Sequence, residues 1–220
     1  MTDDHSAGAE PAATGTRRVA YRVESDRLLM RCWSPSDAVD LRSALDESDR
    51  HLRPWIPFMK DEPRSLPRTA DWLRRIRAGF DRDEDYRYAV RRSDPGCLAG
   101  EVMLMRRAGP GALEVGYWIT RSQVGTGFAT EATMAIIRVA FEIDRVDRVE
   151  LHCSPDNAAS RAIPVRLGFI HEATLRRRFV DAGGTRHDSM IWTLFADGYS
   201  RSPAARCPVK AFDVLGDRVL

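Results

Sequence analysis

The chain has 220 residues, which is enough for one domain with extensions and for a substantial buried core. Its hydrophobic content of 43%, charged content of 30% and net charge of +2 are typical of a globular protein and give no reason to expect nucleic-acid binding. The four cysteines include no Cys-x-x-Cys pair, and no apolar run is long enough to span a membrane, so we expect no metal and a cytoplasmic protein.

The first 46 residues predict a tail, a short strand or arm, a core strand and a helix. Residues 1–17, rich in Ala, Gly, Thr and Asp, predict a disordered tail. A short strand or arm at 18–23 precedes the first core strand at 27–33, and the helix that follows, capped by Ser34 or Asp37, is predicted to end near Asp46.

The segment 51–59 is apolar but contains two prolines, which favours a loop. That loop either packs over the core or uses Trp55 and Phe58 as part of a wall of a substrate site.

The remaining elements follow from periodicity and turn residues. The strand that ends at Ile119, the helix after Gly127 and the strand at 149–153 predict a right-handed parallel crossover. Residues 200–220 carry scattered apolar side chains and form either a dimer arm or a segment that packs on its own domain. The other predicted elements are a helix over 68–80, strands over 86–90, 98–105 and 113–119, a helix over 157–167, and a final hairpin of 169–180 and 186–195 across the turn at 181–184.

The stretch from Gln123 to Glu131 places two glycines directly before an amphipathic helix. A helix start offers backbone N–H groups without intrahelical partners at the positive end of the macrodipole, and glycines let a bulky anion approach. The pattern therefore predicts a phosphate site, unless Gly125 and Gly127 only make a tight turn. Phe128 replaces the lysine of a P-loop, and Thr130 replaces the third small residue of a dinucleotide fingerprint, so both of those motifs are rejected.

Together with its neighbours, this stretch resembles the coenzyme A loop of the GNAT superfamily of N-acetyltransferases. The likeness covers roughly residues 25–197, and the ordered set of motifs resembles the branch of ribosomal-protein N-terminal alanine and serine acetyltransferases. The motifs that carry it are Glu114–Ile119 for the strand before the loop, Ala129–Ala132 for the helix start, Arg148–Leu151 for the next strand, and Asn157–Arg161 with Leu167–Phe169 for the following helix and its end.

The resemblance implies an α/β (α+β) fold of GNAT type over residues 18–199, with 200–220 as a C-terminal extension. In that fold a mixed, mostly antiparallel sheet has a central splay between two parallel strands and is flanked by helices. The implied activity is transfer of an acetyl group from acetyl-CoA to a primary amine, either a protein N-terminus or a small molecule, by direct attack. A homodimer is a further expectation, and the competing class is an acyl-CoA-binding sensor that has lost turnover.

The resemblance also implies how the co-substrate is held. The loop amides would bind the diphosphate, the main chain near Ile119 would pair with the pantetheine arm, and Asn157 would bind a pantetheine amide. The implied cofactor-binding set is Trp118, Ile119, Thr120, Gln123, Val124, Gly125, Thr126, Gly127, Phe128, Ala129, Thr130, Asn157 and Ser160.

Two residues are catalytic candidates. Glu114 is the candidate general base, acting through a water, with a solvent-facing strand carboxylate as the alternative. Ser160 is the candidate donor to the leaving sulfur, because Pro164 stands where many relatives carry a tyrosine; for Ser160 and Asn157 the alternative is helix capping. Pro164 also deprives the Ser160 carbonyl of its i+4 donor, so we expect that carbonyl to order a water or the amine. Tyr117 joins Trp55 and Phe58 in the predicted acceptor site.

Overall fold

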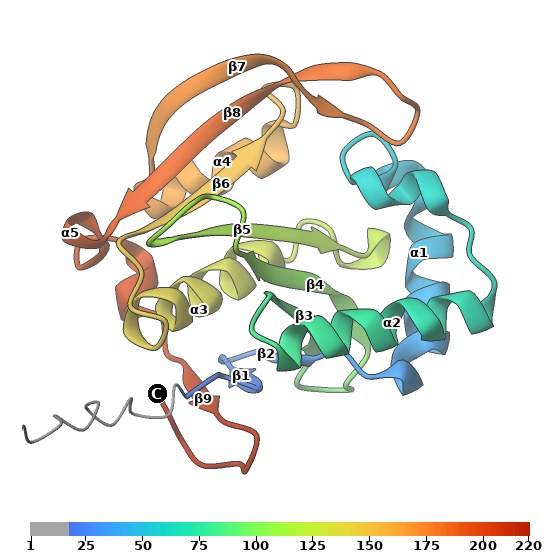
Figure 1. The fold of residues 1–220 in the computed structure, drawn as a ribbon, viewed down its shortest axis with the longest axis horizontal. Helices are drawn as coiled ribbons and strands as arrows, with labels where there is room; N and C mark the ends of the chain where they lie inside the picture. The colour runs from blue at the N-terminus through green and yellow to red at the C-terminus, as the bar shows by residue number, and fades with distance from the viewer. Residues whose placement is uncertain (1–17) are drawn as a thin grey trace, which may run out of the picture.

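The computed structural model describes residues 18–220, so the predicted tail at 1–17 lies outside the described residues. Within these described residues, nine strands form one sheet in the order β7-β8-β6-β5-β4-β3-β2-β1-β9 (Figure 1). The strands are β1 Arg22–Glu24, β2 Leu28–Cys32, β3 Asp85–Arg92, β4 Leu98–Met105, β5 Ala112–Ile119, β6 Arg148–Cys153, β7 Ile170–Val180, β8 Arg186–Phe195 and β9 Lys210–Phe212. The helices are α1 Ala38–Leu52, α2 Leu66–Asp81, α3 Phe128–Glu142, α4 Ala158–Leu167 and α5 Ala196–Tyr199.

The sheet is mixed and mostly antiparallel, and within residues 18–220 its one parallel pair is β5 with β6. Helices α1 and α2 lie on one side of the sheet and α3 on the other (Figure 1). This arrangement confirms the predicted fold class and the predicted crossover from β5 through α3 to β6.

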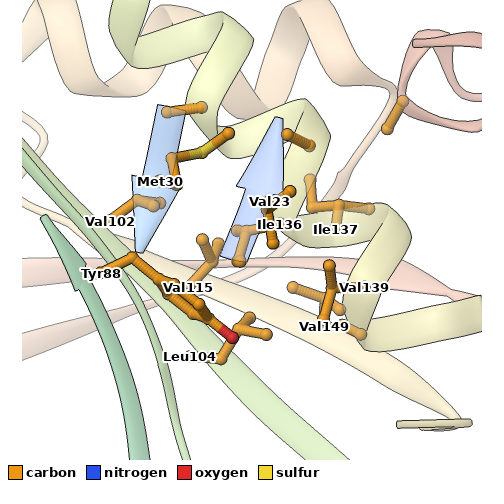
Figure 2. Close-up of a cluster of buried hydrophobic side chains, with 14 of the residues drawn as sticks. Val23, Met30, Tyr88, Val102, Leu104, Val115, Ile136, Ile137, Val139 and Val149 are labelled. Carbon is orange, nitrogen blue, oxygen red and sulfur yellow. The ribbon is translucent and has the colours of Figure 1, made fainter. Parts of the chain in front are cut away.

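Each face of the sheet has its own core. Figure 2 shows the larger one, where Ile136, Ile137 and Val139 of α3 pack against strand side chains such as Val115 and Val149. All five of these side chains are at most 1% exposed. The smaller core joins Trp118 of the sheet to α1 and α2. Because side chains alternate along a strand, successive residues of β5 point into different cores.

Helix α1 is longer than the sequence predicted. It continues past Asp46 to Leu52, because Ser48 and Leu52 extend the buried stripe that Leu41 and Leu45 begin. Pro54 then prevents further helix. The predicted end near Asp46 was therefore wrong. The predicted loop at 51–59 is instead the end of α1, a turn, and the start of a short 3-10 helix, η2 Pro57–Asp61.

Strands β5 and β6 pair from Ala112 opposite Arg148 to Val115 opposite Leu151. Beyond that point each strand remains paired on its outer side, β5 with β4 as far as Ile119 and β6 with β8 as far as Cys153. The edges of β5 and β6 that face each other therefore diverge, while the opposite edge of each strand stays paired with β4 or β8. We call this divergence, between residues 116–119 of β5 and 152–153 of β6, the splay.

The C-terminal segment packs on its own chain. Strand β9 pairs with β1 at the edge of the sheet, and Ala204, Cys207, Val209 and Ala211 are buried. Of the two interpretations of residues 200–220, packing on the same domain describes this arrangement. Within residues 18–220 no helix is long and apolar enough to cross a membrane.

Candidate active site

The glycine-bearing loop before α3 presents free backbone groups. Gly127 is the N-cap residue of α3 with φ 84°, and Gly125 has φ 82°, a region that favours glycine. No side chain of residues 18–220 caps this helix start. A Cβ built on Gly125 would meet nothing within 4 Å among the described residues. The loop therefore exposes amides at the positive end of a 15-residue helix, which fits a diphosphate.

A distant arginine fixes this loop. The Arg27 guanidinium donates from Nη1 to the Thr126 carbonyl at 3.1 Å and lies 4.8 Å from the Phe128 ring centroid. It also pairs with Glu131 at 2.6 Å, a carboxylate that further accepts from the Ser25 hydroxyl at 2.8 Å. The role of Arg27 cannot be predicted from the sequence, because 99 residues separate it from Thr126 and no local pattern links them.

The end of β5 directs backbone groups into the splay. Thr120 donates its N–H to the Ala99 carbonyl of β4 at 2.8 Å. Successive residues of a strand point their amides to opposite sides, so Ile119 directs its N–H and C=O away from β4 and toward the diverging β6. Among the predicted main-chain partners Trp118, Ile119 and Thr120, Ile119 is the one whose backbone faces the splay.

Ser160 and Asn157 lie together at the start of α4, on the α3 side of the splay. The Asn157 Oδ1 accepts the Ser160 N–H at 3.1 Å, which is the capping contact named above as the alternative role of Asn157. The Ser160 hydroxyl lies 3.0 Å from the Tyr117 hydroxyl of β5. The Ser160 carbonyl, expected to order a water or an amine, instead accepts the Tyr117 hydroxyl proton at 3.2 Å. Burial raises the pKa of Tyr117 above its ordinary value.

Glu114 lies on the opposite face of β5. It is 3% exposed, so it is not the solvent-facing carboxylate of the alternative interpretation. Arg107 donates to both of its oxygens, at 2.6 and 2.5 Å, and His152 Nδ1 lies 3.4 Å from one of them. Its register partner on β6 is Glu150, within the paired part of the two strands. Glu114 therefore sits one residue before the last pair that precedes the splay.

The predicted acceptor residues do not form one wall. Phe58 packs against Trp72 with ring centroids 5.1 Å apart, on the face of the sheet that α1 and α2 cover. Trp55 belongs to the same connection between these helices, whereas Tyr117 points to the α3 face. The structure thus places Trp55 and Phe58 on the side of Glu114 and places Tyr117 with Ser160.

A buried carboxylate holds the strands beside the splay. Glu101 of β4 is 1% exposed, and it accepts the indole N–H groups of Trp33 and Trp118, each at 2.8 Å. Arg87 completes its partners with two hydrogen bonds of 2.8 Å. These bonds pin Trp118 by its side chain, so β5 is held against β4 where it leaves β6. Sequence spacing gave no sign of this cluster, whose members come from four strands or strand ends.

Comparison with known proteins agrees with this geometry. A model of the GNAT acetyltransferase domain matches residues 27–170. The chain is 28% identical over 187 residues to "Putative ribosomal N-acetyltransferase YdaF" of Bacillus subtilis (strain 168), which covers 77% of this chain and 92% of that protein. A shorter match, 33% identical over 64 residues, covers 29% of this chain and 36% of the ribosomal-protein-serine acetyltransferase of Escherichia coli (strain K12).

Solved structures show the same fold. RimL, a ribosomal alpha-N-protein acetyltransferase solved in complex with coenzyme A, superposes with a TM-score of 0.71 at 20% identity, over 79% of this chain and 97% of that one. The domain match alone spans well over half of the sequence. This chain therefore belongs to the GNAT acetyltransferase family and is an acyltransferase of that family.

Proposed function

We propose that this protein transfers the acetyl group of acetyl-CoA to a primary amine by direct attack of the amine on the thioester. The observation that carries the proposal is the splay between β5 and β6, which opens beside the uncapped start of α3. The start of α3 offers amides for a diphosphate, and the splay offers strand backbone for an extended, amide-rich arm. Their order along the chain suits one ligand with both parts, as coenzyme A is.

The chain's own groups would hold the co-substrate as follows. The amides from Gly125 to Thr130 bind the diphosphate, with Arg27 keeping the loop in shape. The predicted amides of Gln123 and Val124 are not available, because they donate to the carbonyls of Thr120 and Arg121. The backbone of Ile119 pairs with the pantetheine arm in the splay. An N–H of this strand end would face the thioester oxygen, and one such fixed donor contributes about 3 kcal/mol to lowering the barrier. Acetyl-CoA supplies the activated acyl group.

The two catalytic candidates keep their proposed roles on opposite faces of β5. Glu114 accepts the amine proton through a water, since each carboxylate oxygen retains a lone pair beyond the one that Arg107 occupies. Ser160 donates to the sulfur from the α3 side. The amine then approaches on the face of Glu114, past Trp55 and Phe58, while coenzyme A enters from the face of α3 and α4.

For the acceptor we propose a protein N-terminal amine. Support comes from the names of the relatives, which include a ribosomal N-acetyltransferase and a ribosomal-protein-serine acetyltransferase. Exposed arginines on β7, Arg176 to Arg178, suit an acidic peptide.

The test is acetyl-CoA-dependent acetylation of a panel of peptides with different first residues and of small amines, read by mass. A mass gain of one acetyl group on peptide α-amines is the expected result. Acetylation of small amines alone would reject the proposed acceptor. Binding of coenzyme A without acetylation of any acceptor would favour the sensor class instead.

A further inference from the structure

Tyr117 and Ser160 meet across the mouth of the splay. Tyr117 comes from the diverging part of β5 and Ser160 from the first turn of α4, 43 residues later. Their hydroxyl oxygens are 3.0 Å apart, and the Tyr117 oxygen is 3.2 Å from the Ser160 carbonyl oxygen. The pair therefore links the two sides of the opening where the proposed thioester would lie.

Pro164 explains why the tyrosine hydroxyl is needed there. In an ordinary helix the residue at position 164 would donate its N–H to the Ser160 carbonyl, but proline has none. The Tyr117 hydroxyl fills that acceptor, while Asn157 takes the Ser160 N–H on the other side. Both backbone groups of Ser160 are thus held by side chains, which fixes the position of its hydroxyl.

Tyr117 and Ser160 each carry one hydroxyl proton, and only the Tyr117 proton is needed by the Ser160 carbonyl. The Tyr117 proton satisfies the Ser160 carbonyl, which leaves the Ser160 hydroxyl proton for either the Tyr117 oxygen or the Cys153 sulfur, its two side-chain partners. A sulfur arriving in the splay can receive the Ser160 proton as a hydrogen bond without leaving the carbonyl unsatisfied, because Tyr117 still serves it. An unsatisfied buried carbonyl would cost about 1–3 kcal/mol.

We propose that Tyr117 is the positioning residue for the leaving thiolate, holding the Ser160 hydroxyl so that it donates to the sulfur as the carbon–sulfur bond breaks. This inference rests on the proposed acetyl transfer. The amine nitrogen forms a bond to the acetyl carbon, the carbon–sulfur bond breaks, and its electron pair stays on sulfur. The amine proton leaves to Glu114 or water, and the thiolate takes a proton from water on release.

Two nearby groups are consistent with this role. Burial raises the pKa of the Tyr117 hydroxyl, so it remains protonated throughout the range in which an amine acceptor becomes neutral. Burial also raises the pKa of the Cys153 thiol at the end of β6, so that thiol stays protonated at neutral pH and does not compete as a nucleophile.

The test compares full-length wild type with Tyr117→Phe, Ser160→Ala, the double variant and the control Tyr88→Phe. Tyr88 is a matched control, because its buried hydroxyl also donates to a backbone carbonyl, that of Ala20 at 2.7 Å, but away from the splay. For each protein, kcat and KM for acetyl-CoA, the Kd for CoA by calorimetry, and the melting temperature are measured.

The expected pattern is a kcat loss of about 100-fold for Ser160→Ala and about tenfold for Tyr117→Phe. The Kd for CoA stays within about twofold, which assigns the loss to the transition state. The double variant should be no slower than Ser160→Ala, because Tyr117 acts through Ser160. Tyr88→Phe should keep the wild-type kcat.

Other outcomes overturn the inference. An unchanged kcat for Tyr117→Phe, a weakened Kd with unchanged kcat, or losses that multiply in the double variant would each show that Tyr117 does not act through Ser160. If the wild type acetylates no acceptor at all, the proposed function is wrong, and this inference, which depends on it, is wrong too. The wild-type measurement thus separates the two failures.

Discussion

Arg27 of the β1–β2 turn holds Thr126 of the α3 loop by a 3.1 Å hydrogen bond from its guanidinium to the threonine carbonyl. The same side chain neutralises Glu131, which is 8% exposed and lies in the first turn of α3. The loop that we propose as the diphosphate site is thus shaped by a residue that lies 99 positions earlier in the chain. Without Arg27, the loop would lose its anchor and Glu131 its compensating charge.

Arg27→Gln should therefore weaken CoA binding by about tenfold. The loop would lose a hydrogen bond that orders it, and the Glu131 carboxylate would stand unpaired next to the diphosphate. Calorimetric titration with CoA measures this effect. The matched control is Arg22→Gln, which removes an exposed arginine that pairs with Glu24 of the same strand, β1, at 3.5 Å. Equal Kd values for both variants and wild type would show that Arg27 does not shape the site.

The role of Glu114 as a base can be distinguished from the role of its ion pair with Arg107 by replacing each residue in turn with neutral glutamine. If Glu114 accepts the amine proton, Glu114→Gln should lower kcat near pH 7 by about 100-fold. Arg107→Gln leaves the carboxylate in place with His152 beside it, and its kcat should fall by less than about tenfold. Steady-state kinetics against pH measures both. Similar losses in the two variants would mean that the ion pair is only structural.

The lowered pKa of Asp37 makes the stability of the fold depend on pH. Burial pushes the pKa of Asp37 up, but hydrogen bonds from Arg31 and from the Ser34 backbone N–H outweigh it, so the pKa lies below its ordinary value. A lowered carboxyl pKa stabilises the fold above the unfolded-state pKa of about 3.9, and this stabilisation is lost as the pH falls through the lower folded-state value.

Asp37→Asn should therefore cost about 2–3 kcal/mol at pH 7, and its difference in stability from wild type should shrink as the pH falls below the unfolded-state pKa of about 3.9. Urea unfolding at several pH values measures both quantities. Asp40→Asn is the control, because Asp40 pairs with Arg91 but is half exposed, and it should change stability by less than about 1 kcal/mol. A constant difference between wild type and Asp37→Asn from pH 7 to pH 2 would contradict the lowered pKa.

The sequence predicted local features well and long-range contacts poorly. Strand β4 was predicted with its observed bounds, because turn residues flank an apolar run, and the glycines before α3 were located from their spacing. The contact of Tyr117 with Ser160 could not be predicted, since it depends on how far β5 and α4 diverge. Pro164 showed that the Ser160 carbonyl lacks a helical donor, but not which group replaces it.

Removing residues 201–220 tests the role of the C-terminal segment. The truncation deletes β9 and the buried side chains of η4 Pro203–Arg206 and of residues 207–211. It also removes the Cys207 carbonyl that accepts a hydrogen bond from Arg138 at 2.8 Å. We expect a loss of about 3 kcal/mol from burial alone, or roughly 6–12 °C in melting temperature.

A pair of point variants keeps the C-terminal test independent of chain length. Val209→Asp buries a charge at a position that is 8% exposed, whereas Leu215→Asp changes one that is 83% exposed. Calorimetric melting should show a drop of several degrees for Val209→Asp and none for Leu215→Asp. Equal melting temperatures for wild type and the truncated chain would show that the segment adds nothing to the domain.

The most direct measurement of the central claim is calorimetric titration of CoA into wild type, Gly125→Asp, Gly125→Asn and Gly216→Asp. Gly125 and Gly216 have φ of 82° and 87°, and a Cβ at either meets nothing within 4 Å among the described residues, so the backbone strain is matched. We predict saturable binding to wild type and to Gly216→Asp, with Gly125→Asp weaker than Gly125→Asn by at least about tenfold, because a carboxylate repels the diphosphate. Absence of heat and of any melting shift with wild type, or equal affinity in all four proteins, would contradict the account.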